Sequence, residues 1–191
     1  MVAKREKSGV ILTDAEQIVG FRVKPSPNWL ADCSLFILLG MIGLLQRVSS
    51  AAVEVDSTEI ARIGRGLLVL IGVQRGDAAM QADRLLERLL TYRVFADDAG
   101  RMNRNLQDVG GGLLLVPQFT LAADTRKGTR PGFSPAAEPV DGKQWFEYLV
   151  GRARNAHAVV QTGSFGADMK VSLTNDGPVT FWLQVDPMHD A

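Results

Sequence analysis

The chain has 191 residues, of which 46% are hydrophobic and 22% charged, enough apolar material for a domain with its own core. Its 21 Lys and Arg residues balance its 21 Asp and Glu residues, which excludes a generally basic nucleic-acid-binding protein and restricts any RNA contact to a local patch. The single cysteine, Cys33, excludes a disulfide framework and a thiolate metal site, and it fits a reducing, cytoplasmic setting.

Residues 1–40 differ in character from the rest of the chain. A charge cluster and a Pro-Ser-Pro break precede an apolar run at residues 35–45, which is too short to span a bilayer as a helix. A long mixed stretch separates the basic cluster from this run, which argues against a signal peptide. We therefore predict an extension outside the core at residues 1–40, a domain at residues 41–187, a tail at residues 188–191 and no membrane segment.

Within the domain, hydrophobic patterning predicts strands and two amphipathic helices. Alternating or continuous apolar runs indicate strands, and apolar residues three and four positions apart indicate helices. The predicted helices run from a candidate N-cap at Gly76 or Asp77 to about Tyr92, and from Asp141 to Asn155. No internal repeat or linker is visible, so the sequence predicts one α+β domain. The predicted strands are residues 41–48, 53–55, 67–71, 113–116, 158–160 and 179–185.

Residues 175–180 read Asn-Asp-Gly-Pro-Val-Thr and lie between two apolar runs. Asp-Gly flanked by alternating apolar residues predicts a β-hairpin connection. Pro178 directly after Gly177 is unusual in that setting, because proline removes a backbone donor from a strand and lowers the cost of a cis peptide bond. The local pattern leaves two interpretations open, an ordinary turn and a backbone device that meets a ligand.

The most basic window of the chain is the loop at residues 125–132, which is Gly-rich and has no apolar period. Such a loop is either a solvated surface loop or a phosphate-contacting one, since phosphate contacts need flexible cations rather than a hydrophobic pattern. The candidate phosphate contacts are Arg126, Lys127 and Arg130.

Catalytic motifs that depend on histidine, cysteine or a metal are missing from the sequence. His157 lies at a predicted helix end and His189 in the tail, and neither has the pattern of a triad base. No His, Cys or Asp cluster has metal-ligand spacing, and no P-loop or strand-linked GxGxxG motif is present. An enzyme with this sequence would use hydroxyls, amides and backbone dipoles, without cofactor or metal. Such groups suit the hydrolysis of an activated ester.

Two stretches read together resemble the D-aminoacyl-tRNA deacylase family. Residues 117–121 (PQFTL) resemble the family's SQFTL motif, and residues 175–180 (NDGPVT) match its NxGPxT motif. The resemblance covers the predicted domain and none of the first forty residues. It implies a homodimer of α+β subunits, with mixed or antiparallel sheets and two main helices, that hydrolyses D-aminoacyl-tRNA and mischarged glycyl-tRNA. Further matching segments occur in family order at residues 45–48, 92–95, 100–103, 130–133 and 162–169.

The resemblance also implies a chiral gate. Gly177 and Pro178 would be the family's Gly-cisPro pair, which reaches into the pocket of the partner subunit and rejects L-amino acids by backbone contact. Arg47 would hold the orientation of this pair, and an ordinary exposed arginine is the alternative. Asn175 and Thr180 are the remaining matched motif residues.

For catalysis the resemblance leaves two interpretations open. Thr120 matches the threonine once taken as the nucleophile, whereas a second view gives catalysis to backbone amides near Gln118 and Phe119 together with the 2′-OH of the terminal adenosine. We favour the second, because no base is visible to activate Thr120. The implied adenosine pocket consists of Phe119, Phe133, Phe165 and Met169, and an ordinary core position is the alternative for the last two.

The chain departs from the family at Pro117, where serine is usual. The replacement removes a hydroxyl and a backbone N–H beside the implied pocket. It therefore leaves open a non-catalytic protein that binds the tRNA end on the same scaffold, and also a structural dimer with no RNA role. The first prediction remains a cytoplasmic tRNA-ester hydrolase whose partners are the acceptor end of aminoacyl-tRNA and a second copy of the chain.

Overall fold

The computed structural model of the chain describes residues 40–186. Apart from Gly40, the predicted extension at residues 1–40 lies outside the described residues, and so does the predicted tail at residues 188–191. Of the predicted domain at residues 41–187, the structure describes residues 41–186.

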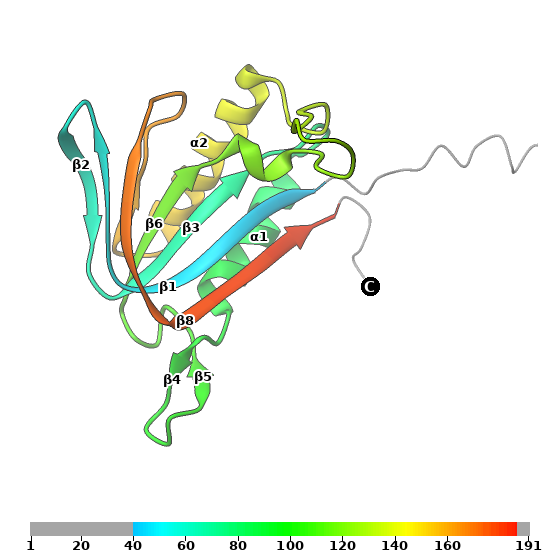
Figure 1. Cartoon of the computed structure of the whole chain (residues 1–191). Helices are drawn as coiled ribbons and strands as arrows, with labels where there is room; N and C mark the ends of the chain where they lie inside the picture. The colour runs from blue at the N-terminus through cyan, green and yellow to red at the C-terminus, as the bar shows by residue number, and fades with distance from the viewer. Residues whose placement is uncertain (1–39, 187–191) are drawn as a thin grey trace, which may run out of the picture. The chain divides into compact units, whose positions relative to one another are not determined.

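A single long strand, β1 (Met41–Val55), organises the sheet. Along one edge it pairs antiparallel with β8 (Lys170–Val185), and along the other it pairs antiparallel first with β3 (Gly66–Gly72) and then with β2 (Thr58–Ile63). Figure 1 shows β1 lying between β3 and β8. The sequence predicted two separate strands here, at residues 41–48 and 53–55. That division is wrong because β8 pairs with Ser50, Ala51 and Ala52 between them, and β2 pairs with the two alanines.

The sheet is mixed because its other half is parallel. The strand β6 (Gly112–Pro117) pairs parallel with β3, and β7 (Val160–Thr162) pairs parallel with β6. A separate two-stranded sheet consists of β4 (Phe95–Ala96) and β5 (Met102–Arg104). These two short strands and β2 were not predicted from the sequence.

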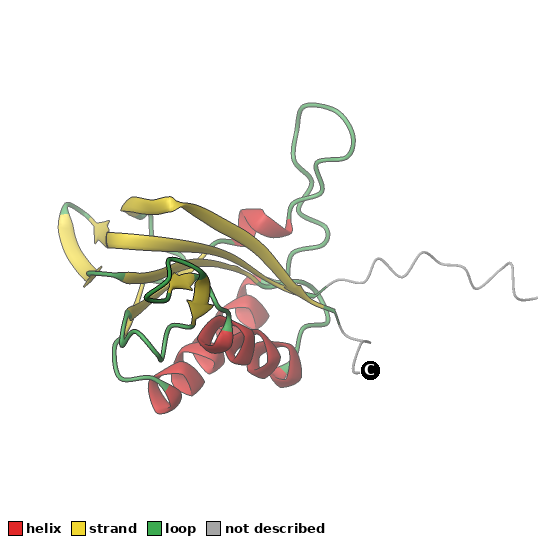
Figure 2. Ribbon diagram, turned by 90° about the horizontal axis from the view of Figure 1, so that it is seen from below, coloured by secondary structure: helices red, strands yellow, loops and turns green. Residues whose placement is uncertain are grey.

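Two helices, α1 (Ala79–Thr91) and α2 (Pro139–Ala156), cover one face of the sheet. In Figure 2 both lie on the same side of the strands. Alternation along β3 explains this layering, because Leu67 and Val69 belong to the core against the helices while Leu68 belongs to a second cluster on the other face. The predicted α+β class, with a mixed sheet and two main helices, is confirmed.

The predicted hairpin at residues 175–180 is wrong. The strand β8 runs through this segment without reversing, and it pairs with β1 on both sides of it, at Asn175 with Val48 and at Thr180 with Gln46. Only Arg47 lies between the two paired residues of β1, whereas residues 176–179 lie between those of β8. The additional residues leave the ladder as a bulge, so Asp-Gly and Gly-Pro here mark a bulge rather than a chain reversal.

Asp77 does not cap α1, contrary to the sequence prediction. The N-cap is Ala78, whose N–H donates to Oε1 of Gln81 at 3.0 Å. The Asp77 carboxylate is buried, and its Oδ2 accepts instead from the N–H of Gln74 at 2.7 Å. Its Oδ1 is buried without a partner among the described residues. Burial raises the pKa of Asp77 to about 7, against the lowering effect of backbone hydrogen bonds from Gln74 and Met41.

We expect Asp77 to make the protein less stable as the pH rises from about 4 to about 7. In this window the folded carboxyl keeps its proton and the unfolded one has lost it, so the free energy of unfolding falls by about 1.4 kcal/mol per unit of pKa difference. Above about 7 both forms are ionised and the loss is complete. Asp77→Asn should remove this fall, as measured by urea unfolding at pH 5 and pH 8.

The control is Asp56→Asn, in the exposed turn after β1. Its free energy of unfolding should change between pH 5 and pH 8 as that of the wild type does. If the Asp77→Asn protein loses as much free energy of unfolding between pH 5 and pH 8 as the wild type does, Asp77 does not cause the pH-dependent fall in stability.

Candidate active site

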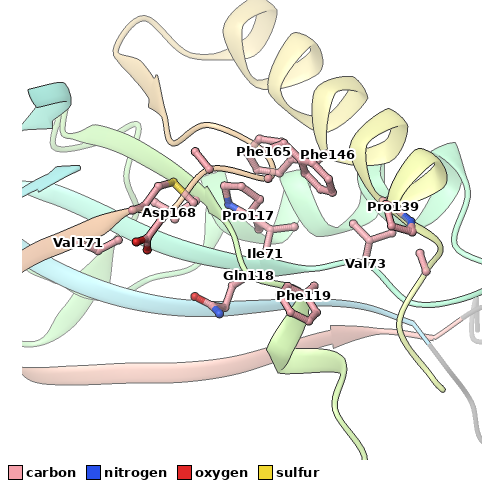
Figure 3. A pocket seen from close by; sticks show the side chains of 16 residues that line it. Ile71, Val73, Pro117, Gln118, Phe119, Pro139, Phe146, Phe165, Asp168 and Val171 are labelled. Carbon is pink, nitrogen blue, oxygen red and sulfur yellow. The ribbon is translucent and has the colours of Figure 1, made fainter. Parts of the chain in front are cut away.

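A cavity of about 480 Å³ opens where β3 and β6 end, beside the start of α2. Figure 3 shows Phe165 and Phe146 together on one side of it, with Gln118 and Phe119 on the opposite side. Because β3 and β6 are neighbouring parallel strands, the segments that follow their carboxyl ends lie close together, as in many sites built on parallel sheets. The lining residues are Ile71, Val73, Val116, Pro117, Gln118, Phe119, Ala137, Pro139, Gly142, Phe146, Phe165, Gly166, Ala167, Asp168, Met169 and Val171.

Four predicted site residues line this cavity: Gln118, Phe119, Phe165 and Met169. Phe165 and Met169 are half-buried, so their side chains both pack on the domain and remain available to a ligand. Phe133 does not line the cavity. Its ring is exposed and lies against Phe119 at 5.1 Å between centroids. The cavity therefore includes three of the four aromatic and methionine positions implied for adenosine.

Thr120 lies beside the cavity rather than in its lining and is exposed. Its Oγ1 accepts a hydrogen bond from Nε2 of Gln118, which is a donor and cannot act as a base. No histidine or carboxylate is bonded to Thr120 in the described part of the chain. The side chain thus lacks the neighbour that activates a nucleophilic hydroxyl.

The alternative to a threonine nucleophile is catalysis by backbone amides near Gln118 and Phe119, and the start of the short helix η1 (Phe119–Ala122) shows which amides could take part. The Gln118 N–H donates to the carbonyl of Ile71 at 2.7 Å, so the prediction that amides near Gln118 act together needs correction at that residue. The amides of Phe119 and Thr120 open η1, where N–H groups have no intrahelical acceptor. These two amides are therefore candidate backbone donors beside the cavity.

Asp168 is a lining residue that the sequence analysis did not assign. Among the residues that line the cavity it is the sole ionisable one, and Figure 3 shows it with Gln118 toward the same end. Val73, Phe146 and Pro139 were also missed. Their hydrophobic pattern is that of ordinary core and helix-start positions, and only the folded chain brings them to one cavity.

The bulge at residues 176–179 is closed by the side chain of Asn175. Its Oδ1 accepts from the N–H of Val179 at 2.7 Å, and its Nδ2 donates to the Thr180 Oγ1 at 3.0 Å. The peptide bond between Gly177 and Pro178 is cis. Asn175 and Thr180 thus brace the segment that contains the Gly-Pro pair.

Arg47 contacts this bulge from the opposite strand. Its Nε donates to the carbonyl of Asp176 at 2.9 Å and lies 3.3 Å from the Asp176 carboxylate, while its NH1 donates to the carbonyl of Val94. The Arg47 side chain is 14% exposed, so it is not an ordinary surface arginine. One guanidinium fork therefore joins the bulge to the segment before β4.

Gly177 has no room for a side chain. Its φ is +142°, which L-residues rarely adopt. A Cβ there would lie 2.6 Å from Cγ2 of Val179 and 3.0 Å from NH2 of Arg47. Neither Gly177, Pro178 nor Arg47 lines the cavity of its own chain. The structure thus presents the predicted gate and the predicted pocket as two separate places on one subunit.

The predicted phosphate contacts gather at a third place. Arg126, Lys127 and Arg130 line a second hollow of about 380 Å³, together with Asp124, Gly132 and Ser134. Between residues 40 and 186, no three His, Cys, Asp or Glu side chains lie close enough together to hold a metal ion. No helix in the same range is long and apolar enough to cross a membrane.

Two solved structures share this fold. The "c-Myc DNA Unwinding Element Binding Protein" is 32% identical with a TM-score of 0.73, and the match covers 75% of this chain and 98% of that one. A structure described as "a probable eukaryotic D-amino acid tRNA deacylase" is 18% identical with a TM-score of 0.68, over 76% of this chain and 99% of that one. The second likeness shows the fold alone, and together the two structures place this chain in a known α+β fold class.

The sequence comparisons are more specific. The profile of the D-Tyr-tRNA(Tyr) deacylase family matches residues 44–184. A D-aminoacyl-tRNA deacylase of Thioalkalivibrio sulfidiphilus (strain HL-EbGR7) is 66% identical over 147 residues, which are 77% of this chain and 99% of that protein. One from Alkalilimnicola ehrlichii (strain ATCC BAA-1101 / DSM 17681 / MLHE-1) is 64% identical over 147 residues, 77% of this chain and 98% of its own. The chain belongs to the D-Tyr-tRNA(Tyr) deacylase family.

Proposed function

We propose that the protein hydrolyses the ester bond of D-aminoacyl-tRNA, and of mischarged glycyl-tRNA, and releases the free amino acid and tRNA. The observation that carries the proposal is the cavity at the end of β6. The matched motif at residues 117–121 supplies Gln118 and Phe119 to its lining, and the matching segment at residues 162–169 supplies Phe165 and Met169. Relatives at 66% and 64% identity over 98–99% of their length are named D-aminoacyl-tRNA deacylase. The charged tRNA substrate is consistent with a cytoplasmic enzyme.

The size and lining of the cavity suit a nucleoside. A volume of about 480 Å³ falls within the range of small-molecule sites, and its walls are mostly apolar with few polar groups. Aromatic side chains that stack on an unpaired base are the usual protein contact with an RNA end. The terminal adenosine would lie between Phe165 and Phe119, with its ester near Gln118.

The proposed chemistry uses no protein nucleophile. Activated esters need a positioned attacking group and donors for the developing oxyanion. Water attacks the ester carbonyl with assistance from the neighbouring 2′-OH of the adenosine, and the amides of Phe119 and Thr120 are placed to donate to the oxyanion that forms. The bond to the 3′-oxygen then breaks, and this oxygen leaves with a proton from the water. Thr120 then serves as an acceptor for the Gln118 side chain, which it holds in place beside the cavity.

We propose that the active form is a homodimer in which the Gly177-Pro178 pair of one subunit closes the cavity of the other. This arrangement is supported by the separation of gate and cavity in one chain and by the outward position of the bulge, where Gly177 and Pro178 are exposed. Backbone facing the substrate α-carbon would exclude an L side chain by contact, whereas glycine and D-residues fit.

Pro117 is compatible with this function. It lies beyond the last residue pair of β6 and β7, Leu115 with Thr162, so its missing N–H removes no bond from that ladder. The ladder with β3 continues past it through the Gln118 N–H.

A non-catalytic protein that binds the tRNA end is the second candidate, since Pro117 in place of serine removes a hydroxyl beside the cavity.

The deciding experiment follows ester loss from D-Tyr-tRNA and L-Tyr-tRNA with the purified full chain. We expect the D-ester to be lost at least about 100-fold faster, because rejection by backbone contact costs several kcal/mol and each 1.4 kcal/mol is about tenfold. Binding of tRNA without D-selective ester loss at micromolar protein would favour the non-catalytic candidate. Sedimentation of the same sample tests the dimer separately.

A further inference from the structure

The loop of residues 124–132, called the basic loop below, carries charges that the proposed reaction does not use. It contains one carboxylate, Asp124, and three cations, Arg126, Lys127 and Arg130, in a chain whose total charge is zero. Backbone hydrogen bonds between Asp124 and Gly132, in both directions at 2.7 and 2.9 Å, close the base of the loop. A closed base holds the cations in one region of the surface.

Arg126 is engaged inside the loop. Its Nε and NH2 donate to the two oxygens of Asp124 at 2.9 and 2.7 Å, and its own backbone N–H donates to Asp124 Oδ1 at 3.0 Å. The guanidinium holds the pKa of the Asp124 carboxyl well below its usual range, so the pair is fully charged at neutral pH. Arg126 is therefore occupied as a donor and its charge is compensated.

Lys127 and Arg130 are different. Within residues 40–186 neither forms an ion pair or a side-chain hydrogen bond, and both are exposed and line the hollow of about 380 Å³. Once Asp124 and Arg126 compensate each other, these two cations leave the loop with a net charge of +2. Flexible, unpaired cations around a hollow are the usual receptor for phosphate groups.

The basic loop is joined to the wall of the cavity at both of its ends. It begins directly after η1, whose first residue, Phe119, lines the cavity, and it ends next to Phe133, whose ring packs on Phe119. Figure 2 shows the loop after η1 standing away from the sheet. If the last base of an RNA strand lies in the cavity, the sugar-phosphate backbone of that strand would run past this loop.

We propose that the basic loop binds the backbone phosphates of the single-stranded 3′ end of tRNA, with Lys127 and Arg130 as the contacting residues and Arg126 held in an ion pair with Asp124 inside the loop. The inference rests on the proposed function only in placing the terminal adenosine in the cavity. The proposal gives Lys127 and Arg130 a role in phosphate contact and Arg126 a role in an internal ion pair. The sequence alone does not distinguish these two roles.

The test compares two substrates that share the same ester and the same adenosine. D-tyrosyl-tRNA carries the phosphates, and D-tyrosyl-adenosine does not. The test variant is the full chain with Lys127→Gln and Arg130→Gln. The charge-matched control carries Arg62→Gln and Arg152→Gln, two exposed arginines on β2 and α2. A third variant, Asp124→Asn with Arg126→Gln, removes the internal ion pair and keeps the net charge.

For the test variant we expect kcat/KM on D-tyrosyl-tRNA to fall about tenfold at moderate salt, mainly through KM, because two phosphate contacts are lost. The activity on D-tyrosyl-adenosine should not change. The slope of log binding constant against log salt for uncharged tRNA should become shallower by about 0.7 for each lost contact. The control and the ion-pair variant should keep the slope of the wild type.

Three results would overturn the inference. An equal loss on both substrates would mean that the cations act on the ester site itself. An unchanged salt slope in the test variant would make the loop an ordinary solvated surface. A slope reduced equally in the ion-pair variant would make Arg126 a contact. If no variant, wild type included, cleaves either ester, the proposed function fails, and the salt slopes for uncharged tRNA still decide the role of the loop.

Discussion

Gly177→Ala is expected to lower the rate of D-aminoacyl-tRNA hydrolysis by about 100-fold or more while the domain stays folded, because a shift of about 1 Å at a positioning group has an effect of that size. The new Cβ would lie 2.6 Å from Cγ2 of Val179 and 3.0 Å from NH2 of Arg47, at a φ of +142°. The bulge must therefore move, and the carbonyls that we propose to face the substrate move with it.

The exposed position of the bulge limits the effect on folding. We expect a loss of stability of about 1–3 kcal/mol, the usual range for one strained residue, measured by thermal or urea unfolding. Gly100→Ala is the matched control. Its φ is also positive, at +77°, but a Cβ there meets nothing within 4 Å, so it should lose about 1 kcal/mol of stability and no activity. A fully active Gly177→Ala enzyme would refute the gate.

Arg47→Ala is expected to reduce the preference for D- over L-aminoacyl-tRNA by about tenfold or more. The guanidinium makes charge-assisted hydrogen bonds to the carbonyls of Asp176 and Val94, each worth about 1.5–3 kcal/mol. Their loss frees the base of the bulge and lets an L side chain push the backbone aside. The measurement is the ratio of kcat/KM values for D-Tyr-tRNA and L-Tyr-tRNA.

Arg88→Ala provides a control with the same chemistry. Arg88 of α1 donates to the carbonyl of Gln184 in β8 at 2.8 Å, so it also ties a side chain to the backbone of that strand, but away from the bulge. Its loss should lower stability and leave the D/L ratio as in the wild type. If Arg47→Ala and Arg88→Ala proteins discriminate equally well, Arg47 has only a structural role.

The sequence predicts several local elements well, because these elements depend on near neighbours. The continuous apolar run at residues 67–71 became β3, and the helical spacing of Leu85, Leu86 and Leu89 became the buried side of α1. The alternation of residues 179–185 became the second half of β8. Gln118 and Phe119, from the matched motif, line a cavity.

The errors occur where pairing partners decide the structure. Asp-Gly predicts a reversal of the chain, yet β1 supplies partners on both sides of residues 176–179 and keeps β8 in one direction. Asp77 looks like a helix cap, but the folded chain buries it beside the N–H of Gln74. In both places a long-range contact overrides a local preference.

By itself, the sequence determined the fold class, the family and the two motifs that carry the proposed activity. Only the tertiary structure decided that Phe146 and Asp168 line the same cavity as Gln118, that Arg47 of β1 contacts the Gly-Pro bulge on the neighbouring strand, and that Arg126 is already paired with Asp124. The physical reason is that motifs and periodicity record which groups are present, whereas donors, acceptors and charges acquire partners only when distant segments meet.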